Sequence, residues 1–173
     1  SRFWPLPTEG TITGQLNPIV FEGGTVTTRG EITAEVFDGE VILTDLYASG
    51  IFSASPLLGL HARWNDLSLE KLTTGTAFGK IEGILEGHVK HLEIAYGQPQ
   101  RFDLLLETVK KRDVDQMLSV RAVENIAQLG GGQSPFMGLA GGFASFFKKF
   151  PYQKMGVHAT LENDVFRVNG TIL

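Results

Sequence analysis

Residues 31–46, EITAEVFDGEVILTDL, alternate between polar and apolar side chains on both sides of a short interruption. Because successive side chains of a β-strand point to opposite faces, Ile32 and Val36 share one face and the glutamates share the other. Asp38-Gly39 interrupts the alternation and is a strong signal for a tight hairpin turn. The stretch therefore predicts two antiparallel strands, joined at Asp38-Gly39, with one apolar and one polar face.

The same pattern recurs toward the C-terminus. Turn residues at Tyr96-Gly97-Gln98-Pro99 and at Asn163-Asp164 each separate two alternating segments. Sequential strands joined by short turns form an antiparallel meander. The predicted strands of these two hairpins are Ile81–Ala95 with Arg101–Val109, and Gly156–Leu161 with Val165–Ile172.

The segment Lys80–Ala95 is long for one strand, and its apolar parity changes midway. A β-bulge near Lys90 accounts for this slip, because a bulge inserts one extra residue. Gly83 and Gly87 stand at apolar positions, where a strand without side chains bends or lets another group come close. We therefore expect a strongly curved sheet, shaped like a half-pipe.

Three segments predict helices. Leu67–Leu72 gives one short turn after a cap at Asp66, and Ala122–Leu129 carries apolar residues at helical spacing before a glycine hinge at 130–132. The third is a Phe-rich helix at 134–150. The predicted fold is thus a single domain, residues 1–173, mainly β, a curved antiparallel meander with two or three helices packed at one end.

The Phe-rich helix begins after a Ser134 cap with Pro135 in its first turn, and Pro151 ends it. At about 15 residues it is too short to span a bilayer, so its aromatic face needs another cover. Two roles stay open: a gate that moves on the glycine hinge, or a permanent plug of the core. The apolar residues of this face are Phe136, Leu139, Phe143, Phe146, Phe147 and Phe150.

Composition limits the classes of function. The 173 residues carry a net charge of −4, with 42% hydrophobic and 20% charged residues, as in ordinary globular domains, and no basic surface for nucleic acid is evident. Absence of cysteine excludes disulfides and thiolate metal sites. The last residues, Thr171-Ile172-Leu173, alternate without a capping device, so we expect a C-terminal fragment of a longer protein.

No set of residues predicts catalysis, a cofactor or a metal. His88 and His91 are three apart, which places them on opposite faces of a strand unless the bulge intervenes. His61 and His158 lack acidic or histidine neighbours at ligand spacing. A row of charged residues on one face of the long strand, Glu82, Glu86, His88 and Lys90, is typical of a solvated sheet face, and no nucleophile accompanies it.

Several predicted strands carry large apolar side chains on one face. This wall is either an ordinary core, covered by the Phe-rich helix, or the concave lining of a ligand groove. The predicted lining residues are Ile32, Val36, Val41, Leu43, Leu85, Val89, Phe102, Leu104, Leu106, Val157, Leu161, Phe166 and Val168.

Five segments after residue 66 resemble a known family in pattern. They are Phe78–Val89, Leu92–Pro99, Phe102–Thr108, Val120–Ile126 and Leu161–Phe166. With the glycine hinge and the Phe-rich segment, they are similar to the C-terminal region of the bacterial AsmA-like family, the TamB- and YdbH-type proteins. The resemblance covers the chain from about Leu67 onward.

The resemblance implies a periplasmic β-structure of a Gram-negative bacterium, held in the inner membrane by a helix outside this chain. Such proteins resemble bridges that conduct phospholipid acyl chains along an apolar groove toward the outer membrane. The implied partners are a phospholipid or other acyl-chain lipid, both membranes, and a periplasmic or outer-membrane protein. The alternative is a structural and interaction domain that supports outer-membrane biogenesis through protein contacts, with the Phe-rich helix as a core plug.

Overall fold

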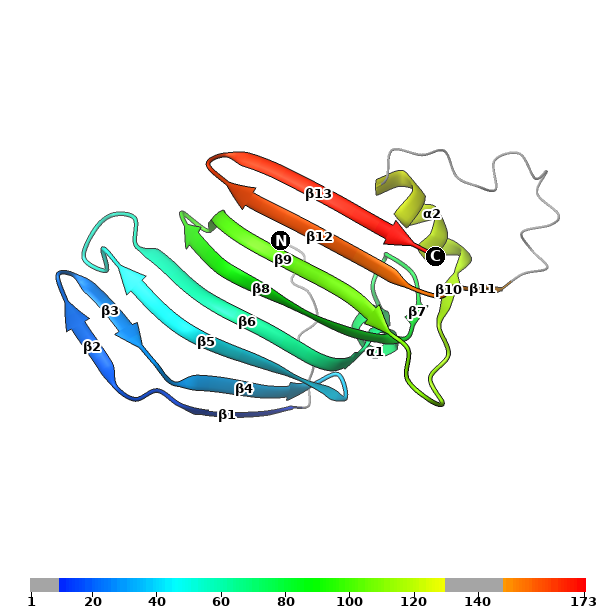
Figure 1. Cartoon of the computed structure of the whole chain (residues 1–173), viewed down its shortest axis with the longest axis horizontal. Helices are drawn as coiled ribbons and strands as arrows, with labels where there is room; N and C mark the ends of the chain where they lie inside the picture. The colour runs from blue at the N-terminus through cyan, green and yellow to red at the C-terminus, as the bar shows by residue number, and fades with distance from the viewer. Residues whose placement is uncertain (1–9, 130–147) are drawn as a thin grey trace.

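The computed structural model describes residues 10–129 and 148–173, which form a large, curved, open antiparallel sheet (Figure 1). The sheet has ten strands in the order β1-β4-β5-β6-β8-β9-β12-β13, with β3 pairing β5 and β2 pairing β3. Its strands are β1 (Thr11–Gln15), β2 (Ile19–Glu22), β3 (Thr25–Thr28), β4 (Glu31–Val36), β5 (Gly39–Ser49), β6 (Leu57–Ser68), β8 (Ile84–Ala95), β9 (Gln98–Val109), β12 (Met155–Glu162) and β13 (Val165–Ile172).

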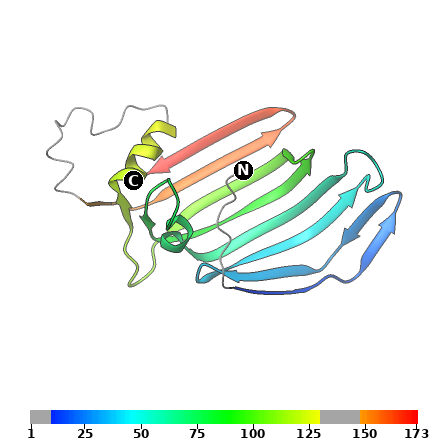
Figure 2. The same cartoon turned by 180° about the vertical axis from the view of Figure 1, so that it is seen from behind.

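A second, three-stranded sheet and two helices lie at one end of these strands (Figures 1 and 2). The predicted fold class, a curved antiparallel meander with short helices at one end, is confirmed. The small sheet has the order β11-β10-β7. Its strands are β7 (Ile81–Glu82), β10 (Met117–Ser119) and β11 (Lys149–Pro151), and the helices are α1 (Leu69–Thr73) and α2 (Val120–Leu129).

The predicted hairpins form, and the first turn lies one residue earlier than expected. Phe37 and Asp38 have φ of 51° and 62°, and Gly39 already pairs with Val36. Two positive φ values in a two-residue loop are those of a type I′ turn. Gly39 is needed for another reason: a Cβ there would lie 2.3 Å from the carbonyl oxygen of Asn65.

The predicted long strand is divided at Gly83, where φ is 141°. Residues before this glycine belong to the small sheet as β7, and those after it to the large sheet as β8. The predicted bulge is confirmed, because the register between β8 and β9 shifts after Lys90 and His91 has a φ of 52°. Further shifts occur in β5 and β6, where Asp45 and Asp66 also have positive φ.

The first helix starts later than predicted. Leu67 is the penultimate residue of β6, and Ser68, not Asp66, caps α1 by accepting a hydrogen bond from the Lys71 amide at 3.3 Å. Asp66 is part of the β6 irregularity instead, so its side chain does not serve the helix.

The predicted Phe-rich helix falls mostly outside the described residues. Phe136, Leu139, Phe143, Phe146 and Phe147 therefore stay untested, as does the glycine hinge. The prediction is wrong for the last turn of this helix, because Lys149–Pro151 form strand β11 and Phe150 pairs with Leu118 of β10. Strand pairing overrides the helical spacing of the phenylalanines at this position.

Candidate functional site

Every predicted lining residue lies on one face of the large sheet, which we call the apolar face. The cross-strand register shows this directly, since residues opposite each other on neighbouring strands share a face. Ile32 lies opposite Leu43, Val89 opposite Leu104, and Leu161 opposite both Phe102 and Phe166. The remaining predicted positions, Val36, Val41, Leu85, Leu106, Val157 and Val168, have the same parity on their strands.

The bulges preserve this arrangement. In β8, the extra residue at the bulge moves the apolar parity from Val89 to Leu92, so that Leu92 faces Leu60 of β6 on the same side. Without that residue, the second half of β8 would present its apolar side chains to the polar face. The parity change in the sequence is therefore what keeps the apolar face continuous.

Additional members of the apolar face were not predicted. Trp64 lies between Val41 and Gly87, and Ile12 lies opposite Ala34 at the β1 edge. The alternation in Thr11–Gln15 and Leu57–Trp64 carries the signal that identifies them. Ile19, Phe21 and Leu58 join the face through β3 and β5.

Among the described residues, the apolar face is open to solvent toward the edges of the sheet and half-buried on its central strands. Phe166 and Val168 of β13 are 60% and 57% exposed, and Ile12 of β1 is 75% exposed. Phe166 and Phe102 contact each other edge to face, with ring centroids 6.3 Å apart. Large contiguous apolar surfaces of this kind mark sites of interaction with other molecules.

One end of the apolar face is covered by α1, α2 and the three-stranded sheet. We call these three elements together the plug; from here on the name does not refer to the predicted Phe-rich helix. Its core is the buried cluster Leu69, Ile81, Leu118, Ala122 and Tyr152. Leu85 of β8 and Met155 of β12 pack against this cluster from the large sheet. Of the predicted lining residues, Leu85 thus packs against the core of the plug.

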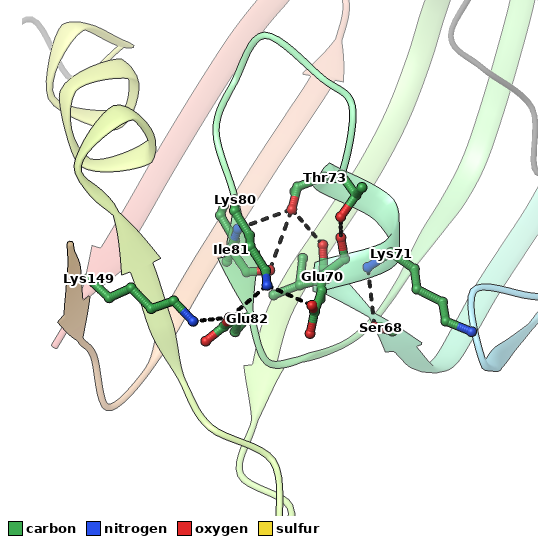
Figure 3. Close-up of polar contacts among 10 residues, drawn as sticks. Ser68, Glu70, Lys71, Thr73, Lys80, Ile81, Glu82 and Lys149 are labelled. Carbon is green, nitrogen blue, oxygen red and sulfur yellow. Dashed lines mark hydrogen bonds and ion pairs between the residues drawn. The ribbon is translucent and has the colours of Figure 1, made fainter.

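Ion pairs fasten the plug together around Glu82 (Figure 3). Its side chain, only 13% exposed, accepts hydrogen bonds from Lys149 of β11 and from Lys80, whose ammonium lies 2.9 Å away. Lys80 also lies 2.6 Å from Glu70 of α1. Lys149 first, then Lys80, lowers the pKa of the Glu82 carboxyl, and hydrogen bonds to Glu70 and then to Glu82 raise the pKa of Lys80.

A buried hydroxyl gives the plug a second fastening. Thr73 of α1 accepts a hydrogen bond from the Ile81 amide at 3.0 Å and donates to the Leu69 carbonyl at 2.7 Å (Figure 3). Tyr152 donates to the Glu82 carbonyl at 2.8 Å. These contacts connect α1 to β7, and the segment after β11 to β7. They therefore hold the elements of the plug together.

The opposite face of the sheet is polar and carries a shallow, open hollow of about 480 Å³. Most of the residues that line this hollow belong to the polar face, although Ala62 and Val89 of the apolar face also border it. Its carboxylates are paired, Glu86 with Lys111 at 3.5 Å and Glu107 with Lys154 at 3.1 Å. Other side chains lining it include Thr44, His61, Arg63, Asn65, His88 and Lys90.

His88 and His91 do not lie on opposite faces, because the bulge intervenes. His88 pairs with Arg63 on the polar face, and the His91 ring packs against His61 at 4.7 Å between centroids. His61 also lies 3.6 Å from Asp45. Within residues 10–129 and 148–173, no group of three or more potential ligands could hold a metal ion.

The comparisons with known proteins identify no relative: no protein-family model, curated protein or solved structure matches the chain. In the described part of the chain, neither helix has the length and apolar character needed to cross a membrane. The resemblance to AsmA-like proteins therefore stays a prediction. What the geometry supplies is an apolar face that is exposed toward the edges of the sheet, half-buried on its central strands, and covered by the plug at one end.

Proposed function

We propose that this chain is a non-enzymatic lipid-binding module whose apolar face binds the acyl chains of phospholipids. One observation carries the proposal: large apolar side chains occupy the same face of successive strands, half-buried at the centre of the sheet and exposed toward its β13 edge. A face of this kind is costly in water unless a ligand or a partner covers it. Acyl chains match it because they need continuous apolar contact and no polar partner.

The plug suits this function. Leu85 and Met155 connect the apolar face to the plug core, so an acyl chain lying along the strands meets a closed end there. Each buried methylene contributes about 0.8 kcal/mol, and affinity should therefore rise steeply with acyl chain length. A protein partner that covered the same face would show no such dependence.

In the cellular setting that the resemblance implies, the module is part of a periplasmic bridge anchored in the inner membrane. Its polar face would contact water and its apolar face would conduct phospholipid toward the outer membrane. The second candidate, a structural and interaction domain for outer-membrane biogenesis, is favoured by the edge of β13, beside which no further strand lies among residues 10–129 and 148–173. The lipid content of the purified protein separates the two.

The test is lipid extraction and native mass spectrometry of the purified chain, followed by titration with fluorescent acyl probes of increasing length. We expect co-purified phospholipid and tighter binding of longer chains. Leu104→Asp should weaken binding at least about tenfold, because a carboxylate would have to be buried against the acyl chain. The matched control is Leu105→Asp, which makes the same change at the next residue on the polar face.

A second pair of variants controls for misfolding. Phe166 is exposed, so Phe166→Asp leaves few packing contacts to lose, and Arg167→Asp on the opposite face is its control. Retained binding in folded Leu104→Asp and Phe166→Asp would contradict the assignment of the apolar face. Purified protein that carries no lipid and binds no acyl probe would overturn the proposed function.

A further inference from the structure

The two edges of the large sheet differ in how they are protected. On the N-terminal side, the edge consists of β1 and β2, of five and four residues, with Pro18 between them. Short strands and proline are common means of preventing a sheet from adding further strands. This edge offers no long run of backbone groups for pairing.

The edge formed by β13 has none of these protections. Val165–Ile172 pairs with β12 through eight consecutive residues without a register shift, and all eight residues are exposed. The strand contains neither proline nor lysine, and Arg167 is its only charge. In the described part of the chain, β13 has no neighbour on its other side. A long, regularly paired and exposed edge of this kind is a template for strand pairing.

We propose that β13 pairs antiparallel with β13 of a second copy of this chain, about a twofold axis at Asn169. In an antiparallel pair, the residue numbers of any two opposite residues add up to the same value. The residues of β13 on the apolar face have even numbers, so they lie opposite one another in the two copies only when that value is even. A centre at Asn169 satisfies this condition and uses the whole strand together with Leu173. An isologous contact of this type closes as a dimer.

The side chains are complementary in this register. On the apolar face, Phe166 lies opposite Ile172 of the second copy. On the polar face, Arg167 lies opposite Thr171, so that no like charges meet. A centre at Arg167 would instead place two guanidinium groups opposite each other, which is unfavourable.

The dimer extends the apolar face. A twofold axis perpendicular to the sheet keeps the same face of both copies on one side, so the two apolar faces join across β13. Phe166, Val168 and Ile172, which are more than half exposed in one copy, then lie near the middle of the combined surface. This inference does not depend on what the apolar face binds.

Sedimentation equilibrium of the full chain over a wide range of concentration tests the proposal. We expect a monomer–dimer equilibrium. Asn169 is exposed on the polar face, so Asn169→Lys should leave the monomer folded and weaken the dimer at least about tenfold by placing like charges opposite each other. Thr13→Lys, the same type of change on the polar face of β1, should leave the dimer unchanged.

The decisive experiment combines two variants of opposite charge at residue 169. Asn169→Glu alone should weaken the dimer as Asn169→Lys does, and mixing the two variants should restore a one-to-one dimer, because only the register centred on residue 169 places these two charges opposite each other. A wild-type chain that stays monomeric at all concentrations overturns the proposal. So does a dimer that survives Asn169→Lys, or one that Thr13→Lys dissociates.

Discussion

The phenol of Tyr47 on β5 donates a 2.8 Å hydrogen bond to the carboxylate of Glu93 on β8, passing over Gly59 of the strand between them. A Cβ at Gly59 would lie 2.1 Å from the Tyr47 ring, so only glycine leaves room for this contact. Burial, and after it the hydrogen bond from the phenol to Glu93, raises the pKa of Tyr47 to about 12. Three strands are thus joined on the polar face.

Gly59→Ala should displace the Tyr47 ring and return its pKa toward the ordinary value of 10.0. Ultraviolet titration of the tyrosines measures this, with Tyr47→Phe identifying the signal. We expect a loss of about 1 kcal/mol of stability from the broken hydrogen bond. Because the folded-state pKa is raised, the contribution is complete below pH 10 and is lost as the pH rises toward 12. An unchanged titration in Gly59→Ala would contradict this contact.

The Glu82 ion pairs predict acid sensitivity of the plug. The folded-state pKa of Glu82 is lowered from 4.5, so its contribution is present above that value and is lost as the pH falls through the lower, folded-state pKa. Glu82→Gln should cost about 1 kcal/mol at neutral pH and nothing in strong acid, measured by urea unfolding across pH. The matched control is Glu86→Gln, which removes a pair with Lys111 outside the plug. Equal losses in both variants would refute a special role for Glu82.

Gly83 permits the close approach of the plug to the large sheet. Its φ is 141°, and a Cβ there would lie 2.2 Å from the hydroxyl oxygen of Tyr152. Gly83→Ala should therefore cost about 2 kcal/mol or more in unfolding free energy. Gly75→Ala is the control, because Gly75 also has a positive φ but has nothing within 4 Å, and it should cost about 1 kcal/mol. Adding Tyr152→Phe should reduce the effect of Gly83→Ala, since the clash involves the hydroxyl.

Alternation in the sequence predicted β4, β5, β8, β9, β12 and β13 of the large sheet, whereas β1, β2, β3 and β6 were not among the predicted strands. Turn residues and period-two patterning located the hairpins, and the parity change after Val89 located the bulge, because each is a local property of the strand. The division at Gly83 was not predictable in the same way. It depends on Tyr152, some 70 residues later in the sequence, whose hydroxyl occupies the space beside the glycine.

The predicted lining residues share one face, but other members of that face, such as Trp64 and Ile12, and its surroundings were not predicted. Register follows from patterning, so all lining residues fall on one face. The plug is built from segments with weak local signals, such as the three-residue strands Met117–Ser119 and Lys149–Pro151. For Phe150, helical spacing indicated the wrong element, because pairing with Leu118 decides its conformation.

The histidines of the polar face lead to the last prediction. The bulge brings His91 beside His61, with Asp45 within 3.6 Å of His61, so proximity alone could suggest a metal. A structural zinc site needs four ligands in tetrahedral arrangement, and these residues do not form such a set. Treatment with a chelator should leave the melting temperature unchanged, and added zinc should not raise it.

His91→Ala provides the matching measurement. It removes the ring contact with His61 at an exposed position, so we expect a change in unfolding free energy of no more than about 0.5 kcal/mol, the same with and without zinc. Stoichiometric metal in the purified chain, together with a chelator-induced fall in melting temperature that His91→Ala abolishes, would instead establish a metal site. In that case the bulge at His91 would serve to assemble ligands, rather than only to keep the apolar face continuous.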